Sequence, residues 1–190
     1  WKPGTEYDIE MEPELFAKHI KLEKYKGSFT TYQFRASIAS SSFHIDPTDE
    51  DVKQIIATIK FSHPVDPETF EKRVLLRPYK LDKKIRSIEN RDYRLTITYD
   101  DFFSEAYIVS ESLPIPEDDV QMQISISKGV GSSWKGNNLE NSLSASVRVA
   151  GMLNFARIES VQQTIVRNEA YQSEQILVVD TKGKVKPTEL

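Results

Sequence analysis

Apolar and polar residues alternate along much of this chain. The alternation is strictest in four segments, at 55–61, 93–99, 120–127 and 143–149. In the first of these, Ile55, Ile59 and Phe61 fall on one face and Lys60 falls on the other. A period of two predicts β-strands, and one polar face per strand is typical of antiparallel sheets that cover a core on one side. Less regular segments at 34–45, 74–77 and 106–110 are further strand candidates.

Helical patterns are scarce. Asp66 is a cap residue followed by Pro67, which suits the first position of a helix, and Phe70 and Val74 would share a face. We predict one or two helical turns there. A second short helical piece is predicted at about 12–24, where Phe16 and Ile20 form the apolar pair.

Turn-forming residues separate the strand candidates. They occur at 46–49, 62–64 and 114–116, and in a longer loop at 129–141 that contains Trp134. About seven short strands in roughly 115 residues is the size of one immunoglobulin-like module. The chain has no cysteine, so the hallmark disulfide of antibody domains is absent. We therefore predict an all-β fold built from immunoglobulin-like antiparallel β-sandwich modules of the wider, disulfide-free class.

The pattern divides the chain into three parts. Residues 36–150 form one complete sandwich, residues 1–35 resemble the last strands of a preceding module, and residues 151–190 resemble the first strands of a following one. The flanking strand candidates lie at 1–11, 29–34, 155–166 and 175–179. Segments this short cannot close a sandwich alone, so we expect the chain to be cut from a longer protein at both ends.

Composition limits the classes of function. The net charge is −4, and 28% of the residues are charged, as in ordinary globular proteins. No apolar stretch approaches the roughly 20 residues of a membrane helix, so we expect no direct membrane insertion. The absence of cysteine excludes disulfides, zinc–thiolate sites and cysteine nucleophiles within the chain. The mild acidity argues against nucleic acid as a partner.

One stretch, 71–94, departs from this acidity. Its nine cations are Lys72, Arg73, Arg77, Lys80, Lys83, Lys84, Arg86, Arg91 and Arg94, and its four anions are Glu71, Asp82, Glu89 and Asp92. Two interpretations remain open. The stretch is either a solvated loop and strand face or a docking patch for an acidic partner.

No catalytic pattern is present. His19, His44 and His63 lie far apart without metal-binding spacing, and the serine run at 40–42 has no nucleophile-elbow glycines. The pair Gly129 and Gly131 lies between strands, which does not suit a phosphate cradle. We therefore assign no catalytic, cofactor-binding or metal-binding residue, expect no cofactor and predict that the chain is not an enzyme.

Three acid clusters and one tryptophan leave alternatives. Residues 46–51, 100–101 and 117–119 each hold several carboxylates, which could bind calcium but also suit turns, and none has EF-hand spacing. Trp134 could be an exposed anchor for a ligand, or its ring could fold back over the edge of the sandwich.

A family resemblance rests on the segment 61–70, Phe-Ser-His-Pro-Val-Asp-Pro-Glu-Thr-Phe, which follows the strand candidate at 54–60. It resembles bacterial immunoglobulin-like modules in which a strand ending in Phe-Ser, a Pro-Val-Asp turn and a short helical turn recur. The opening Trp-Lys-Pro-Gly-Thr-Glu-Tyr looks like the later part of such a module. Together with 43–54, these features are similar to the macroglobulin-type domains in the N-terminal half of bacterial alpha-2-macroglobulins. The resemblance is strongest at 34–78.

The resemblance implies a large periplasmic protease inhibitor, often a lipoprotein anchored to the inner membrane. In such a trap a protease cleaves a bait segment, the molecule rearranges, and a Cys-Gly-Glu-Gln thioester captures the attacker. This chain has no cysteine, so it would be a non-catalytic scaffold. Its partners would be proteases, through the full-length protein, and the neighbouring domains. No bait segment is identified, although the loop at 129–141 is long and polar.

Two other functions remain open. The same modules could belong to a bacterial surface adhesin or polysaccharide-binding protein, with the loop around Trp134 as the binding surface. A third interpretation is an accessory module of a secreted hydrolase.

Overall fold

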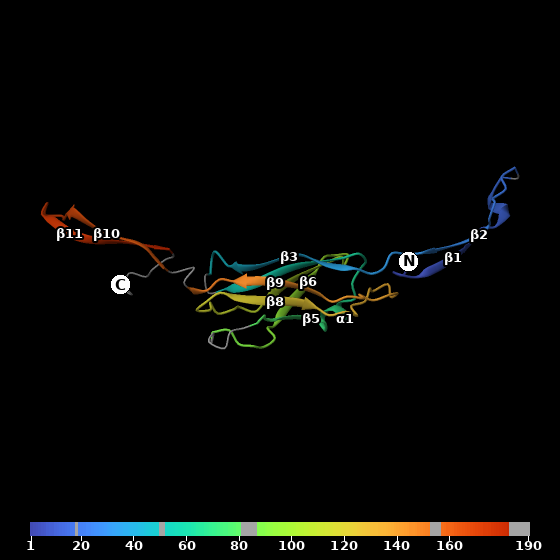
Figure 1. Cartoon of the computed structure of the whole chain (residues 1–190). Helices are drawn as coiled ribbons and strands as arrows, with labels where there is room; N and C mark the ends of the chain where they lie inside the picture. The colour runs from blue at the N-terminus through green and yellow to red at the C-terminus, as the bar shows by residue number, and fades with distance from the viewer. Residues whose placement is uncertain (18, 50–51, 81–86, 153–156, 183–190) are drawn as a thin grey trace.

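The computed structural model describes residues 1–17, 19–49, 52–80, 87–152 and 157–182 (Figure 1). The strands in chain order are β1 (Glu6–Glu10), β2 (Lys26–Thr30), β3 (Ala36–Ile45), β4 (Lys53–Phe61), β5 (Val74–Pro78), β6 (Leu95–Tyr99), β7 (Glu105–Ser110), β8 (Val120–Ile126), β9 (Leu143–Val149), β10 (Arg157–Arg167) and β11 (Ser173–Lys182). The helical elements are the 3₁₀ turn η1 (Pro13–Leu15) and the helix α1 (Pro67–Glu71).

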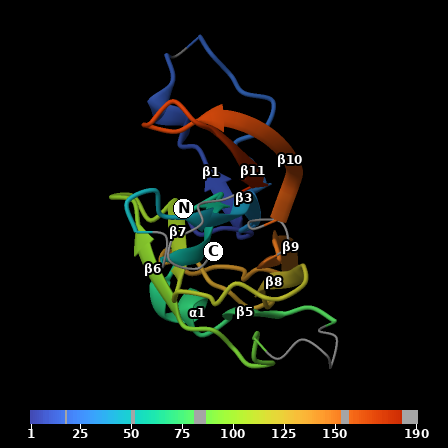
Figure 2. The same ribbon diagram turned by 90° about the vertical axis from the view of Figure 1, so that its left-hand side faces the viewer.

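Strands β3 to β9 form two facing antiparallel sheets. One sheet has the order β3-β4-β7-β6 and the other has the order β5-β8-β9. The end-on view in Figure 2 shows these two layers. With the strands lettered A to G in chain order, the sheets read ABED and CFG, which is the arrangement of a constant-type immunoglobulin domain. The predicted immunoglobulin-like antiparallel sandwich is confirmed.

The hydrophobic core lies between these sheets. Alternate residues of β4 and β8 point inward, and Ile59, Met122 and Ile124 have no exposed surface. All the buried apolar side chains of the core, within the described part of the chain, fall between Phe34 and Val149. The central sandwich therefore buries a closed core of its own.

Helix α1 joins the two layers. The Asp66 side chain accepts a hydrogen bond from the Glu68 amide at 3.2 Å, and Pro67 takes the first helical position, where a missing amide hydrogen costs nothing. The aromatic ring of Phe70 is fully buried and meets Phe61 edge-on, with ring centroids 5.1 Å apart. The predicted short helix is confirmed, and Phe70 fixes it to the core.

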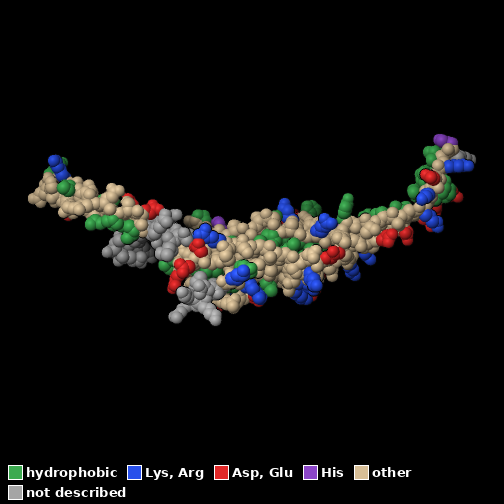
Figure 3. All heavy atoms as spheres, in the orientation of Figure 1, with side chains coloured by type: hydrophobic (Ala, Val, Ile, Leu, Met, Phe, Trp, Pro, Cys, Tyr) green, Lys and Arg blue, Asp and Glu red, His purple; other side chains and the backbone are tan. Residues whose placement is uncertain are grey.

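Two hairpins extend from opposite ends of the sandwich (Figure 1). The pair β1–β2 lies at the N-terminal end and the pair β10–β11 at the C-terminal end, each as a two-stranded antiparallel sheet. Large apolar side chains lie exposed on β10–β11, including Ile165 at 70% and Leu177 at 66% of their surface. Figure 3 shows hydrophobic side chains on the surface of both extensions.

The seven central strands match the sequence predictions to within about two residues at each end. The predicted helix at 12–24 is wrong in extent: among the described residues of this segment only η1 forms, because Phe16 and Ile20 meet no second layer that would bury an apolar stripe. The strand expected at 29–34 lies earlier, at Lys26–Thr30, in register with β1. Among the described residues, no helix is long and apolar enough to span a membrane.

Candidate functional site

The first hairpin meets the sandwich at Asn137, in the loop between β8 and β9. The Asn137 side-chain oxygen accepts a hydrogen bond from the Phe34 amide at 3.0 Å. The Asn137 amide in turn donates to the Pro3 carbonyl at 3.1 Å. One residue therefore holds both ends of the segment that carries β1 and β2. We call this contact the N-terminal junction.

Two glycines allow the close approach at this junction. Gly136 has φ +98°, and a Cβ atom there would lie 2.3 Å from the Pro3 carbonyl oxygen. Gly4 has φ +58°, and its Cβ would lie 2.6 Å from the Asn137 side-chain oxygen. Both positions combine a backbone conformation that favours glycine with no room for a side chain. The loop and the hairpin root are thus shaped to fit each other.

Trp134 and His63 lie in the same region. Their rings meet edge-to-face at a centroid distance of 5.9 Å, and His63 lies 6.5 Å from the ring of buried Phe34. The Ser62 hydroxyl is 2.9 Å from Nδ1 of His63. Trp134 keeps 50% of its surface exposed. The Trp134 ring therefore folds back onto His63 in part and keeps an exposed surface, and its use as an anchor for a ligand stays a prediction.

Burial of the His63 ring lowers its pKa below the ordinary 6.5, since desolvation disfavours the charged form. The Trp134 ring adds no charge that would offset this effect. His63 is therefore neutral at pH 7, and its ring packs as an aromatic group between Phe34 and Trp134.

The loop at 129–141 is tied to the sandwich along its length. The Ser132 hydroxyl donates to the Pro64 carbonyl at 2.9 Å, and the Gly131 amide donates to the Thr69 hydroxyl at 3.0 Å. The Gly131 carbonyl accepts from the Asp66 amide at 2.9 Å. Val130 is fully buried. These contacts make the loop part of the sandwich and do not suit a segment that proteases must enter.

The second hairpin leaves the sandwich through a comparable C-terminal junction. One carboxylate oxygen of Asp119 accepts a hydrogen bond from the Gly151 amide at 2.8 Å, and the other accepts from Arg148 Nε at 2.8 Å. The Met152 amide donates to the Pro116 carbonyl at 2.7 Å. A Cβ at Gly151 would lie 2.5 Å from the Asp118 carbonyl carbon. The exit direction of the chain is therefore set by Asp119 and Gly151.

The acid clusters serve turns. Asp46 accepts hydrogen bonds from the amides of Thr48 and Asp49, and Asp100 accepts from those of Ser104 and Glu105. The pKa of Asp46 is lowered first by a hydrogen bond from the Thr48 hydroxyl and then by the Thr48 amide, and the pKa of Asp100 is lowered first by the Glu105 amide. In the described residues no three metal-ligating side chains converge. Two members of the first cluster, at 50 and 51, lie outside the described residues.

Several cations of the basic stretch form local ion pairs. Arg77 contacts Asp92 at 2.8 Å, and Arg91 contacts both Glu89 and Glu111, at 2.9 and 2.6 Å. Figure 3 shows acidic and basic side chains interspersed on the face in view. Residues 81–86, which include three of the cations, lie outside the described residues. The described part favours a solvated, paired surface over a docking patch.

The residues tested for catalysis are dispersed. His44 is exposed on β3, His19 is exposed between β1 and β2, and His63 lies at the N-terminal junction. Residues 40–42 lie within β3, and the amides of Gly129 and Gly131 donate to Leu139 and Thr69. Among the described residues, the His63 ring contacts the Ser62 hydroxyl, whereas His19 and His44 lie on other elements.

The junction roles of Asn137 and Asp119 were missed by the sequence reasoning, which considered Asp119 only as part of the acid cluster at 117–119. Both residues lie in loops, where asparagine and aspartate are common for local reasons. The available signal was their position, because Asn137 follows a glycine in the loop that contains Trp134 and Asp119 directly precedes an alternating strand.

The chain is similar over its whole length to bacterial alpha-2-macroglobulins. It is 27% identical over 191 residues to an alpha-2-macroglobulin homolog of Yersinia pestis, and this alignment covers all of the present chain. It is 23% identical over 194 residues to an alpha-2-macroglobulin of Pasteurella multocida, again across the whole chain, and 23% identical to one of Rickettsia conorii across 97% of it. The resemblance inferred from the motifs is thereby confirmed.

This similarity concerns a small part of the relatives. The chain spans 9% of the length of the Yersinia protein and 10% of the other two. No family model matches the chain.

Proposed function

Because this chain resembles bacterial alpha-2-macroglobulins along its whole length, we propose that it is a non-catalytic scaffold segment of a periplasmic protease inhibitor of that kind. The observation that carries the proposal is the combination of a closed central sandwich with an exposed apolar hairpin on each side. Such a chain passes from one module to the next, and it carries no cysteine for a thioester.

The proposed domain layout follows from burial. The central sandwich, 36–150, buries a core to which Phe34 of the preceding segment also contributes, whereas β10–β11 leaves Val161, Ile165 and Leu177 more than half exposed. Burying apolar surface stabilises a protein by about 25 cal/mol per Å². A second layer of structure packed on these side chains would therefore stabilise the hairpin. We propose that 1–35 and 151–190 belong to a preceding and a following module, whose remaining strands supply that layer.

The two junctions support a role in positioning. Asn137 accepts a hydrogen bond from the Phe34 amide, where the chain enters the sandwich, and Asp119 accepts one from the Gly151 amide, where the chain leaves it. Side-chain-to-backbone bonds of this kind restrict the direction in which a neighbouring module leaves. Proteases would be partners of the complete protein, and a lipid anchor at the inner membrane would lie elsewhere in it.

The proposal is tested with the complete protein and with this chain alone. The complete protein, incubated with trypsin, is expected to protect a large protein substrate from cleavage and to become covalently linked to the protease if it carries a Cys-Gly-Glu-Gln sequence. The 190-residue chain is expected to leave trypsin activity unchanged. Covalent capture of trypsin by this chain alone would overturn the scaffold assignment.

A second candidate function rests on Trp134, whose ring is half exposed in a rigid loop. An adhesin or polysaccharide-binding module would use that face for stacking on sugar rings. Fluorescence titration with soluble cell-wall glycan separates the two. A saturable change that disappears in Trp134→Ala supports the glycan-binding function, and no change supports the scaffold.

A further inference from the structure

The two open sides of the sandwich differ. On one side the edge strands β3 and β9 lie against each other. On the other side the edges are β5 and β6, and a groove of about 250 Å³ lies between them. In variable-type immunoglobulin domains additional strands occupy this side of the sandwich. The β5–β6 side therefore has the geometry to accept one more strand.

Among the described residues, no strand pairs with the edge of β6 that faces this groove. The Arg94 carbonyl accepts a hydrogen bond from the Glu111 amide, so Arg94 is a hydrogen-bonded position of the β6–β7 ladder. The amide groups alternate in direction along an antiparallel strand. Leu95 and Ile97 therefore turn their amides and carbonyls away from β7, toward the groove.

Strand β5 is less available. Its Leu76 carbonyl accepts a hydrogen bond from the Tyr93 amide at 2.9 Å, which closes one end of the groove. Pro78 occupies the next position that faces away from β8, and it has no amide hydrogen. Edges blocked in this way do not pair readily with other strands. β6 carries no such block: the residues that face the groove are Leu95 and Ile97, with neither charge nor proline between them.

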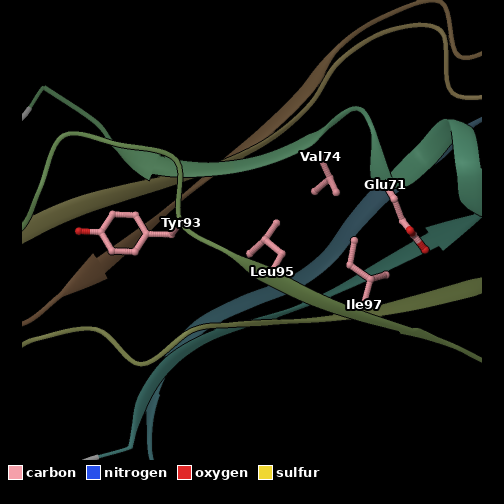
Figure 4. A pocket seen from close by; sticks show the side chains of 5 residues that line it. All are labelled: Glu71, Val74, Tyr93, Leu95 and Ile97. Atoms are coloured by element: carbon pink, nitrogen blue, oxygen red, sulfur yellow. The ribbon is translucent and has the colours of Figure 1, made fainter.

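Apolar and aromatic side chains line the groove, with one acid at its end, and polar atoms make up most of its exposed surface. Val74, Leu95 and Ile97 form the floor, with Tyr93 at one end and Glu71 at the other (Figure 4). The volume is below the roughly 300–1,000 Å³ of small-molecule pockets. The groove suits an extended peptide, because only every second side chain of such a peptide points into it.

Glu71 gives the groove a direction. One of its carboxylate oxygens accepts a hydrogen bond from the Tyr99 hydroxyl at 3.1 Å. Burial, followed by the neighbouring Glu71, raises the pKa of Tyr99, so the hydroxyl keeps its proton and continues to donate. The carboxylate is thus held at the end of β6 where an antiparallel strand would begin.

We propose that the β5–β6 groove binds an extended peptide that pairs with the free edge of β6, seats apolar side chains over Val74 and Ile97, and places a cationic residue near its N-terminus against Glu71. The main-chain bonds would supply affinity and the floor and Glu71 would supply selectivity, as in other cases of strand addition. The proposal concerns the central sandwich alone and does not depend on the protease-inhibitor assignment.

The test uses the 190-residue chain and a fluorescent peptide, acetyl-Lys-Thr-Val-Thr-Val-Thr-amide. We expect saturable binding by fluorescence anisotropy, with amide chemical-shift changes concentrated at Leu95 and Ile97. N-methylation at alternate residues blocks one edge of a strand and leaves the other free, so one methylation register should abolish binding and the other should retain it. Glu71→Gln should weaken binding about 2- to 5-fold, as for an exposed ion pair, and a peptide with Gln for Lys should lose this dependence.

Glu68→Gln is the matched control, because Glu68 lies on the same helix and pairs with Lys72 outside the groove. It should leave peptide binding unchanged. Three outcomes overturn the proposal: no saturable binding at millimolar peptide, equal binding of both N-methylated registers, or shift changes away from β6. Self-association of the chain through β6, seen by sedimentation and unchanged by the peptide, would assign this edge to a second copy of the chain. That result would also overturn the proposal.

Discussion

The side-chain oxygen of Asn137 accepts a hydrogen bond from the Phe34 amide at 3.0 Å, across 103 residues of sequence. This bond links the loop between β8 and β9 to the point where the chain enters the sandwich. Asp119 and Gly151 form the corresponding contact where the chain leaves. The points where the chain enters and leaves the sandwich are therefore each held by a single side chain of the central sandwich.

Asn137→Ala should loosen the first hairpin without unfolding the sandwich. The substitution leaves the Phe34 amide without its acceptor, which costs about 0.5–1.5 kcal/mol of local stability. Hydrogen exchange at Phe34 should become faster, while exchange in β4 and β8 stays as in the parent. Asn141→Ala is the control, since Asn141 is exposed in the same loop. Equal exchange at Phe34 in both variants would contradict the assigned role.

Gly136→Ala should destabilise the chain by more than 1 kcal/mol. The new methyl group would meet the Pro3 carbonyl oxygen at 2.3 Å, in a backbone conformation that alanine rarely adopts. Urea unfolding of the variant measures the loss. Gly27→Ala is a matched change in β2, where nothing lies within 4 Å of the added carbon and φ is ordinary, so it should be neutral or slightly stabilising. A similar loss in both variants would count against close packing at the junction.

Truncating a side chain in the core should lower the free energy of unfolding far more than truncating one on the second hairpin. Phe70→Ala removes a fully buried ring and should cost about 3–5 kcal/mol. Ile165→Ala removes a side chain that is 70% exposed and should change the free energy of unfolding by less than about 0.5 kcal/mol in this chain. Denaturant midpoints compare the two. A large effect of Ile165→Ala would show that the hairpin is packed within this chain.

Acid should weaken the fold partly through His63. Its folded pKa lies below the unfolded value of about 6.5, so below that pH the unfolded state binds the proton first and the free energy of unfolding falls. The contribution is complete above about pH 6.5 and is lost as the pH falls through the folded pKa. His63→Gln should therefore lose less stability than the parent between about pH 7 and pH 5. His44→Gln, at an exposed position, should follow the parent, and identical slopes for all three proteins would refute the His63 contribution.

Calcium should not change the melting temperature. The carboxylates of Asp46 and Asp100 already accept hydrogen bonds from their own turns, which is the ordinary use of aspartate in such positions. Thermal unfolding in the presence of calcium, and again with a chelator, should give the same midpoint. An increase with calcium would reveal a site that the described residues do not show.

The central strands and α1 could be predicted because each carries its own signal in a few residues. β9, for example, alternates from Leu143 to Val149 and is bounded by polar turns, and α1 has a cap followed by proline. The predicted helix at 12–24 failed because one apolar pair, Phe16 and Ile20, cannot sustain a helix without a surface to pack on.

The junctions and the groove could not be predicted in the same way. The Asn137–Phe34 contact joins residues that only the folded topology brings together, and loop asparagines are common. The free edge of β6 depends on sheet order, which the alternation of Leu95 and Ile97 does not reveal. The family resemblance, by contrast, rested on the local motif at 61–70 and was therefore within reach of the sequence.

Hydrogen exchange on this chain and on the complete protein tests the modular account most directly. In the 190-residue chain, amides of β4 and β8 should exchange with the free energy of global unfolding, and amides of β10 and β11 should exchange much faster. In the complete protein, the β10 and β11 amides should become protected as their apolar side chains are covered. Equal protection of β10 and β11 in the two proteins would contradict the claim that this hairpin belongs to a following module.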